Sequence, residues 1–492
     1  MTEAAPRVPF DKTAAALTRR LLKDHVRPHL GRSAAALLCM ALVAAATAAL
    51  AKLMEPILDG VFVGHDRSLL AAVGVAVLVV FVVKGLATYG QAVLMNHVGF
   101  RIVADIQIAM FAHLMRADLA FFHDNHSGGL VSRFISDVQT LRKGVAECLT
   151  GLGKDLLTLL FLVALMFHQD WGLALIAFFA FPAAAVPIVK IGRRLRRVSA
   201  ATQHVVGGLS TLLEEAFQGV RHVKAYGMES YEERRASVEI NRLFRLYSKS
   251  VRARVLAHPI MEGLAGLAVF LVIAYGGYQV IEGARTPGAF FSFLTALFLA
   301  YEPMKRLAQL NATYQEALAA AERVFALLDT APAIVDRPGA CELQVRAGAV
   351  RFESVEFAYK PEVPALAGVS LSVPAGKTAA LVGPSGAGKS TVLNLIPRFY
   401  DATRGRVTID GVDVRDVTLA SLRASIGLVS QEISLFDDTV RANIAYGRAL
   451  ASDDEIRRAA RLAGADDFIA AMPEGYDTRI GELGVKLSGG QR

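Results

Sequence analysis

The chain has 492 residues, enough for two or three domains, and 53% of them are hydrophobic, which excludes an ordinary soluble globular protein over the whole length. The formal net charge is +8, but the basic residues cluster beside long apolar runs, where an anionic cytoplasmic leaflet would attract them. A nucleic-acid partner is therefore not expected. The apolar runs end near Leu310 and a soluble α/β pattern begins after Val350, so we expect the main domain boundary between these residues.

The first 32 residues are too polar for a cleaved signal peptide. They contain apolar and basic residues side by side: Leu21, Leu22, Val26 and Leu30 among Arg19, Arg20, Lys23 and Arg27. This mixture is typical of a short helix that lies on a membrane surface. We expect such an elbow helix within residues 1–32, on the cytoplasmic side.

Six stretches are long and apolar enough to cross about 30 Å of hydrocarbon, which takes roughly 20 helical residues. They cover residues 34–53, 69–89, 149–167, 171–191, 259–281 and 289–307. Buried core helices of a large soluble protein are the alternative, but the charge asymmetry of the connections argues against them. Lysine and arginine concentrate in the second and fourth connections, so both termini are expected in the cytoplasm, with these two connections as helical rods.

Three lysines lie within or at the edge of these spans: Lys84, Lys154 and Lys305. A cation at such depth is costly unless it pairs, faces water or extends to the interface. Lys154 could pair with its neighbour Asp155, and Lys305 could simply reach the membrane surface. Alternatively, the three lysines form a ring of positive charge in an inward-open cavity, which would hold an anionic headgroup.

A phosphate-binding loop is indicated by residues 383–390, which read Gly-Pro-Ser-Gly-Ala-Gly-Lys-Ser and fit the pattern G-x-x-x-x-G-K-[ST]. An apolar strand is expected before it at Thr378–Val382, and a helix after it from Lys389. The glycines allow backbone N–H groups to surround phosphate oxygens, and the helix N-terminus adds positive potential. Lys389 is expected to reach the β- and γ-phosphates of ATP, and Ser390 to bind Mg²⁺. A chance glycine-rich turn is the alternative.

Residues Leu487-Ser-Gly-Gly-Gln491 resemble the signature pentapeptide of ATP-binding-cassette (ABC) proteins, and from Phe10 to Arg492 the chain resembles the ABC exporter family. The resemblance implies an all-α domain of six membrane-spanning helices followed by an α/β P-loop ATP-binding domain. It assigns the nucleotide to Tyr359, Gly383, Ser385, Gly386, Gly388, Lys389, Ser390, Thr391 and Gln431. It assigns contacts with the ATP of a second identical subunit to Leu487, Ser488, Gly489, Gly490 and Gln491.

Within this set, the resemblance implies that Tyr359 stacks on adenine and that Gln431, with Ser390, contacts Mg²⁺. Without it, Tyr359 would be read as an exposed strand residue and Gln431 as a surface residue. Three other segments resemble the coupling regions of exporters. They are residues 121–133 with Asp137, residues 214–226, and residues 481–484.

Within the family, the chain is most similar to the bacterial lipid A (lipopolysaccharide core) flippases, through residues 53–59, 66–69 and 302–305. The three membrane lysines fall where that family lines its lipid-phosphate pocket, with lysine at two positions where arginine is expected. This implies a multi-pass homodimer in the bacterial inner membrane that uses ATP to flip lipid A or a related anionic lipid. A multidrug exporter of the same architecture is the alternative.

The sequence ends at Arg492, directly after the signature. The family continues with a strand ending in a Mg²⁺-associated aspartate, then a catalytic glutamate and a switch histidine, so no catalytic residue is assigned here. We expect that the chain as written neither hydrolyses ATP nor folds its ATP domain fully, as a truncated product or a fragment would behave. The expected parts are the elbow, the transmembrane domain, a linker and an incomplete ATP-binding domain, at residues 1–32, 33–325, 326–348 and 349–492.

Overall fold

The structure, a computed structural model, describes residues 13–125, 127–175, 201–202, 205–360, 363–430, 434–448, 450–481, 487–488 and 490–491. The chain divides into two compact units, Met1–Pro332 and Ala333–Arg492. The first unit is helical in its described residues, and the second combines a sheet with short helices.

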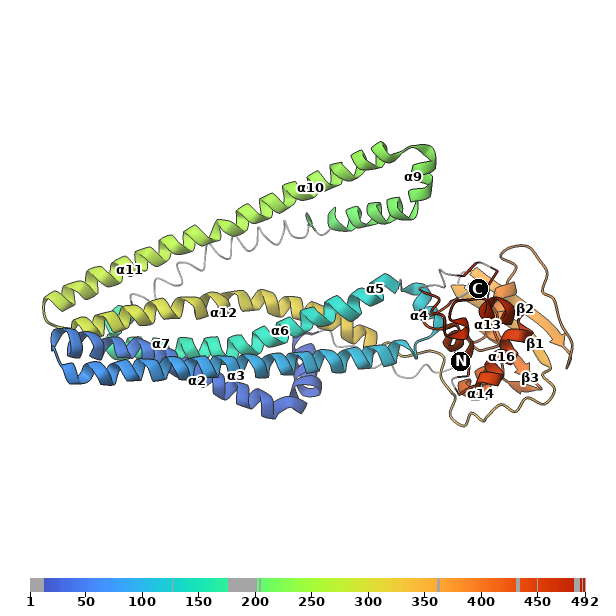
Figure 1. Ribbon diagram of the computed structural model, residues 1–492, viewed down its shortest axis with the longest axis horizontal. Helices are drawn as coiled ribbons and strands as arrows, with labels where there is room; N and C mark the ends of the chain where they lie inside the picture. Colours follow the sequence, from blue (N-terminus) through green and yellow to red (C-terminus); the bar gives the residue numbers. More distant parts are fainter. Residues whose placement is uncertain are drawn as a thin grey trace. The chain divides into compact units, whose positions relative to one another are not determined.

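The first unit begins with the elbow, a bent helical segment before the first long helix. It consists of α1 (Ala14–Arg20), a π-helical turn η1 (Leu21–Val26) and a 3₁₀ turn η2 (Arg27–His29). Thr13 caps α1, since its hydroxyl accepts the N–H of Ala16 at 3.4 Å. The elbow is the dark blue segment that lies along the side of the long helices in Figure 1.

The long helices that follow pack side by side. They are α2 (Leu30–Glu55) with the π-helical turn η3 (Pro56–Val63), α3 (Arg67–Leu114), α6 (Val138–Thr150), the π-helical turn η5 (Gly151–Asp155), α7 (Leu156–Gln169) and α12 (Pro287–Leu328). Small residues permit close approach, as expected for helices in lipid. A Cβ built at Gly144 on α6 would lie 2.1 Å from the Cβ of Ala317 on α12. The buried Ser292 hydroxyl joins α12 to α2 by donating to the Ala51 carbonyl at 2.7 Å.

Three helical runs among the described residues are long and apolar enough to cross a membrane: Ala14–Val63, Arg67–Leu114 and Ser127–Gln169. They contain the first three predicted spans. The fourth predicted span, 171–191, lies mostly outside the described residues. The fifth and sixth fall on α11 (Ala257–Ile281) and on α12.

The second predicted rod contains α9 (Val220–Tyr226) and α10 (Glu229–Val255), and α10 leads into α11. The turn between α9 and α10 uses Gly227 in the left-handed region, at φ +61°. Figure 1 shows α10 running away from α6 and α12. The first predicted rod contains the end of α3, followed by α4 (Leu119–Asp124), α5 (Ser127–Ser132) and η4 (Arg133–Asp137).

The second unit contains a four-stranded antiparallel sheet in the order β2-β1-β3-β4. The strands are β1 (Val350–Lys360), β2 (Val363–Val373), β3 (Arg404–Ile409) and β4 (Val412–Asp413). Its core packs Phe352, Val355 and Val407 of the sheet against Leu395 of helix α13. The helices are α13 (Lys389–Leu395), α14 (Leu419–Ala424), α15 (Val440–Ala445), α16 (Asp453–Leu462), α17 (Asp466–Ala470) and a 3₁₀ turn at Gly475–Asp477.

The strand predicted at Thr378–Val382 is not formed in the structure. A strand requires hydrogen bonds to a neighbour, and no described segment pairs with these residues. The side chain of Val382 is 93% exposed, and that of Val429 in a second apolar segment is 99% exposed. The segments around Val382 and Val429 are therefore as hydrophobic as buried strands, but no strand among the described residues pairs with them.

The entry into the sheet is fixed by one carboxylate, that of Asp410 in the β3–β4 turn. It accepts hydrogen bonds from the backbone N–H groups of Ala347 (2.9 Å), Gly348 (3.1 Å), Ala349 (2.8 Å) and Arg346 (2.8 Å). These bonds favour the ionised form and hold the pKa of the carboxyl well below its ordinary value. The segment before β1 is thereby tied to the end of β3.

Candidate functional site

The loop at residues 383–390 is shaped by two glycines in the left-handed region, Gly386 at φ +83° and Gly388 at φ +82°. Gly388 has a second constraint, because a Cβ there would lie 2.7 Å from the carbonyl oxygen of Ala365. No atom lies within 4 Å of a Cβ built at Gly386. Both positions require glycine for backbone conformation, and Gly388 also requires it for space.

Lys389 begins α13 and folds back over the loop. Its ammonium group donates to the carbonyl oxygens of Gly383 at 2.8 Å and Pro384 at 2.7 Å. Ser390, the next residue, is exposed in the first turn of the helix. The lysine charge and the serine hydroxyl are therefore both held at the loop, as phosphate and Mg²⁺ binding would require. Ser385 is exposed within the loop.

Tyr359 lies at the end of β1 and is brought to the same place by its hydroxyl, 3.2 Å from that of the buried Thr391 in α13. Its ring makes edge-on contacts with Phe357 and Tyr400, at centroid distances of 4.8 and 5.2 Å. The residue remains 51% exposed. A half-exposed aromatic ring beside the loop can stack on a base, and the assignment of Tyr359 to adenine stays a prediction.

The signature segment is described in part. Leu487 is buried in a helical core with Val440, Ile456 and Ile480. The Ser488 N–H donates to the side-chain oxygen of Gln491 at 2.9 Å, and the Gln491 N–H returns a bond to the Ser488 carbonyl at 3.0 Å. Gly490 is exposed in this turn. Gly489 and Gln431 lie outside the described residues, as do residues 482–486, so their predicted roles have no structural counterpart.

In the membrane unit, the structure brings Lys84 on α3 and Lys154 in η5 within electrostatic range of each other. Arg306 on α12 also acts on Lys154, and we call Lys84, Lys154 and Arg306 the cation cluster. Lys305, next to Arg306, lies 4.0 Å from Glu302 on its own helix. Of the three predicted lysines, Lys84 thus acts on Lys154 only weakly, and Lys305 is adjacent in sequence to Arg306, which acts on Lys154 more strongly.

A local pair between Lys154 and Asp155 was one of the alternatives, and the structure adds a second cationic partner for Asp155. Asp155 is 4% exposed, and its carboxylate lies 3.6 Å from the guanidinium of Arg306. Both neighbours lie in the π-helical turn at Gly151–Asp155, and their charges also act on each other. From the sequence, Lys305 was considered as a site residue and Arg306 was not. A signal for Arg306 was present, because an aspartate within a membrane span, such as Asp155, requires a cationic partner.

Arg306 and Asp155 border a polar cavity of about 410 Å³ between α3, α6 and α12. The other polar side chains on its wall are Gln91, Asn96, Glu147, Thr150, Gln309 and Thr313. Gln91 is 7% exposed, and its side-chain oxygen has no hydrogen-bond partner among the described residues. The cavity thus contains the cation of Arg306 and a Gln91 oxygen that lacks a hydrogen-bond partner among the described residues, and a polar headgroup could interact with both.

The sequence matches the ABC transporter transmembrane region over residues 34–304 and the ABC transporter ATP-binding region over residues 366–492. It is 47% identical to an ATP-dependent lipid A-core flippase of Syntrophus aciditrophicus over 474 residues, which are 96% of this chain and 78% of the relative. It is 44% identical to a protein of the same name from Desulfotalea psychrophila, over 93% of this chain and 80% of the relative.

Among solved structures, the fold resembles that of a bacterial Atm1-family ABC exporter with ATP bound. The TM-score is 0.79 and the sequence identity 29%, over 97% of this chain and 82% of the exporter chain.

Proposed function

Because this chain belongs to the ABC transporter family, as an exporter with a transmembrane region followed by an ABC ATPase domain, we propose that it flips lipid A or a chemically related anionic lipid. The lipid would move from the inner to the outer leaflet of a bacterial inner membrane. One observation carries the proposal: similarity at 44–47% identity to lipid A-core flippases extends over more than nine tenths of the chain.

The charges of the membrane unit support an anionic cargo. The charges of Arg306 and Lys84 both act on Lys154, while Arg306 is paired with two carboxylates, Asp155 at 3.6 Å and Glu302 at 3.9 Å. Two carboxylates do not neutralise three cations, so the cluster retains positive charge for a phosphate group. The polar cavity next to Arg306 gives such a group room.

The ATP-binding unit supplies the residues for the driving reaction. Lys389 would neutralise the β- and γ-phosphates, and the loop backbone between Gly383 and Gly388 would bind their oxygens. The Ser390 hydroxyl is an oxygen ligand of the kind that Mg²⁺ prefers, and Gln431 would complete the same position. ATP binding drives transport by stabilising one conformation of the membrane unit over the other.

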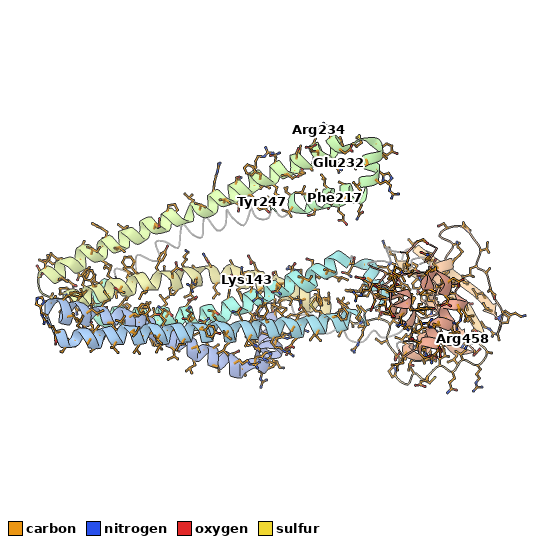
Figure 2. The ribbon with its side chains drawn as sticks, viewed as in Figure 1. Lys143, Phe217, Glu232, Arg234, Tyr247 and Arg458 are labelled. Atoms are coloured by element: carbon orange, nitrogen blue, oxygen red, sulfur yellow. The ribbon has the colours of Figure 1, made fainter. Side chains whose placement is uncertain are left out.

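A second identical subunit is required for this arrangement, because the signature of one copy would face the ATP of the other. An apolar stripe on α10 supports pairing. Its residues recur at helical spacing and are all more than half exposed: Ile240, Phe244, Tyr247, Val251 and Val255. Figure 2 shows Tyr247 on α10 apart from the side chains of α6 and α12, with Glu232 and Arg234 nearer the other end of α10. A stripe of this kind indicates a protein partner.

The test uses protein purified from its native membrane, with its intact mass recorded, in proteoliposomes containing fluorescent lipid A. The proposal predicts ATP-dependent protection of lipid A from an external quencher, and none with a lipid that lacks phosphate. Movement of hydrophobic cations without movement of lipid A would favour a multidrug exporter. Absence of both would contradict the proposed transport function.

A further inference from the structure

A second cavity lies between the elbow and the long helices, and it shares the lining residue Leu310 with the polar cavity beside Arg306. It has a volume of about 440 Å³, within the ~300–1,000 Å³ typical of ligand sites. Its wall is almost entirely apolar and includes Leu17, Leu22, Leu152 and Leu318. We call it the elbow cavity. Its volume is suited to an apolar chain, and its lining offers little to a polar ligand.

The elbow cavity is a built feature, because the elbow is anchored at several points. The hydroxyls of Thr18 and Tyr314 lie 2.9 Å apart. Arg20 forms two hydrogen bonds with Asp329, at 2.6 and 2.8 Å, and its guanidinium lies 4.4 Å from the ring centre of Phe325. These contacts hold the elbow against α12 and define the cavity between them.

Three cations lie at the opening. Arg19, Lys23 and Arg27 follow one another at intervals of four residues, so they share one face of the elbow, and all three are exposed. They line a wide recess that adjoins the elbow cavity through Thr18, Leu22 and Tyr314. None of the three forms a salt bridge with another residue in the described part of the chain. We call them the basic stripe.

The depth of the elbow cavity coincides with the membrane boundary. The first predicted span begins at residue 34, shortly after the elbow, and the third begins at 149, beside the lining residue Cys148. The sixth ends at Leu307, which also lines the cavity. Three independent positions along the sequence therefore place this pocket where hydrocarbon meets the cytoplasmic headgroups.

We propose that the elbow cavity binds one acyl chain of an anionic phospholipid of the cytoplasmic leaflet, with its phosphate on the basic stripe. This lipid would be a resident component that fastens the elbow to α12, and the proposal does not depend on which lipid is transported. A membrane protein attracts anionic lipid most strongly where cations cluster at the interface. Here an apolar receptacle for the chain lies directly beside such a cluster.

Cys148 provides a built-in reporter, since it lines the elbow cavity and all three cysteines are free. The full chain in detergent is titrated with phosphatidylglycerol or phosphatidylcholine, and N-ethylmaleimide modification of each cysteine is followed by peptide mass spectrometry. Phosphatidylglycerol should slow the modification of Cys148 roughly tenfold relative to the exposed Cys341, and phosphatidylcholine should need a much higher concentration. Native mass spectrometry should find phosphatidylglycerol retained on each subunit.

Two variants separate specific binding from general attraction. Replacing Arg19, Lys23 and Arg27 with glutamine should weaken phosphatidylglycerol binding on the order of 100-fold. The matched control removes the same charge from α10, by Arg245→Gln, Lys249→Gln and Arg252→Gln, and should leave the protection of Cys148 unchanged. A third variant, Leu152→Trp, fills the cavity from an exposed position and should reduce lipid retention while the basic stripe remains.

Three results would overturn the proposal. Equal protection by the two lipids would remove the role of the basic stripe. Equal loss in the two triple variants would show only general electrostatic adsorption. A Cys148 that resists modification before any phospholipid is added would show that protein, such as the second subunit, already fills the elbow cavity.

Discussion

The phosphate-binding loop and the cation cluster both present positive charge, but they are assembled over very different distances in the sequence. The loop is complete within residues 383–390, and its shape follows from glycines at fixed positions. The cation cluster draws Lys84, Lys154 and Arg306 from three helical elements far apart in the sequence, and Asp155 in one of these elements pairs with Arg306 in another. A contiguous motif predicts both the residues of a site and their arrangement. For a site between helices, the sequence supplies the residues but does not show which of them pair.

Removal of the loop lysine should give the largest effect. Lys389→Ala should lower the affinity for ATP roughly 100-fold, because charge-assisted bonds to two phosphates are lost. Lys377→Ala is the control, since Lys377 lies in the turn before the loop and touches none of its residues in the described contacts. Binding of a fluorescent ATP analogue measures both. Similar losses in the two variants would show that general charge, and not the loop, holds the nucleotide.

Alanine substitutions at Gly386 and Gly388 should destabilise the ATP-binding unit by different amounts. Gly386→Ala adds only the cost of the backbone conformation, about 1–2 kcal/mol. Gly388→Ala adds the same cost and a contact of 2.7 Å with the Ala365 carbonyl, so it should lower the stability of the ATP-binding unit further. Urea unfolding of the two variants measures the difference. Equal midpoints would contradict the close packing described for Gly388.

The cation cluster can be tested through the ion pair between Arg306 and the buried Asp155. Arg306→Gln should weaken lipid A binding about tenfold through loss of a charged hydrogen-bond donor, and it should also lower the melting temperature because Asp155 is left unpaired. Adding Asp155→Asn should restore the melting temperature but not the affinity. Lys52→Gln, which removes an exposed cation paired with Glu55, is the control. Recovery of both properties in the double variant would show that Arg306 serves structure alone.

The smallest expected effect is on the stability of the second unit, through the carboxylate of Asp410, and it should depend on pH. Because the folded pKa of Asp410 lies below its ordinary value of 3.8, its stabilising effect is present above that value and is lost as pH falls through the folded pKa. Asp410→Asn should therefore lower the urea midpoint at pH 7, with a difference from the wild type that shrinks below pH 3.8. The exposed Asp437→Asn is the control. A difference that stays constant with pH would contradict the role of the charge.

The same contrast explains what could be read from the sequence. The loop around Lys389 and the first three apolar spans follow from local patterns, whereas the ABC exporter family and its architecture were recognised from the resemblance of residues 487–491 and other motifs. The Arg306–Asp155 pair was missed because neighbours in sequence were considered before neighbours in space. The strand at Thr378–Val382 was wrong for a related reason, since a hydrophobic run forms a strand only where another segment pairs with it.

The central claim is that the loop and the cation cluster serve one transport cycle, so their ligands must influence each other. The most direct test is the affinity of the full chain for lipid A with and without a slowly hydrolysed ATP analogue, which needs no turnover. The account predicts that the analogue changes lipid A affinity, and that lipid A changes the affinity for the analogue by the same factor. Affinities that are independent of each other would contradict it.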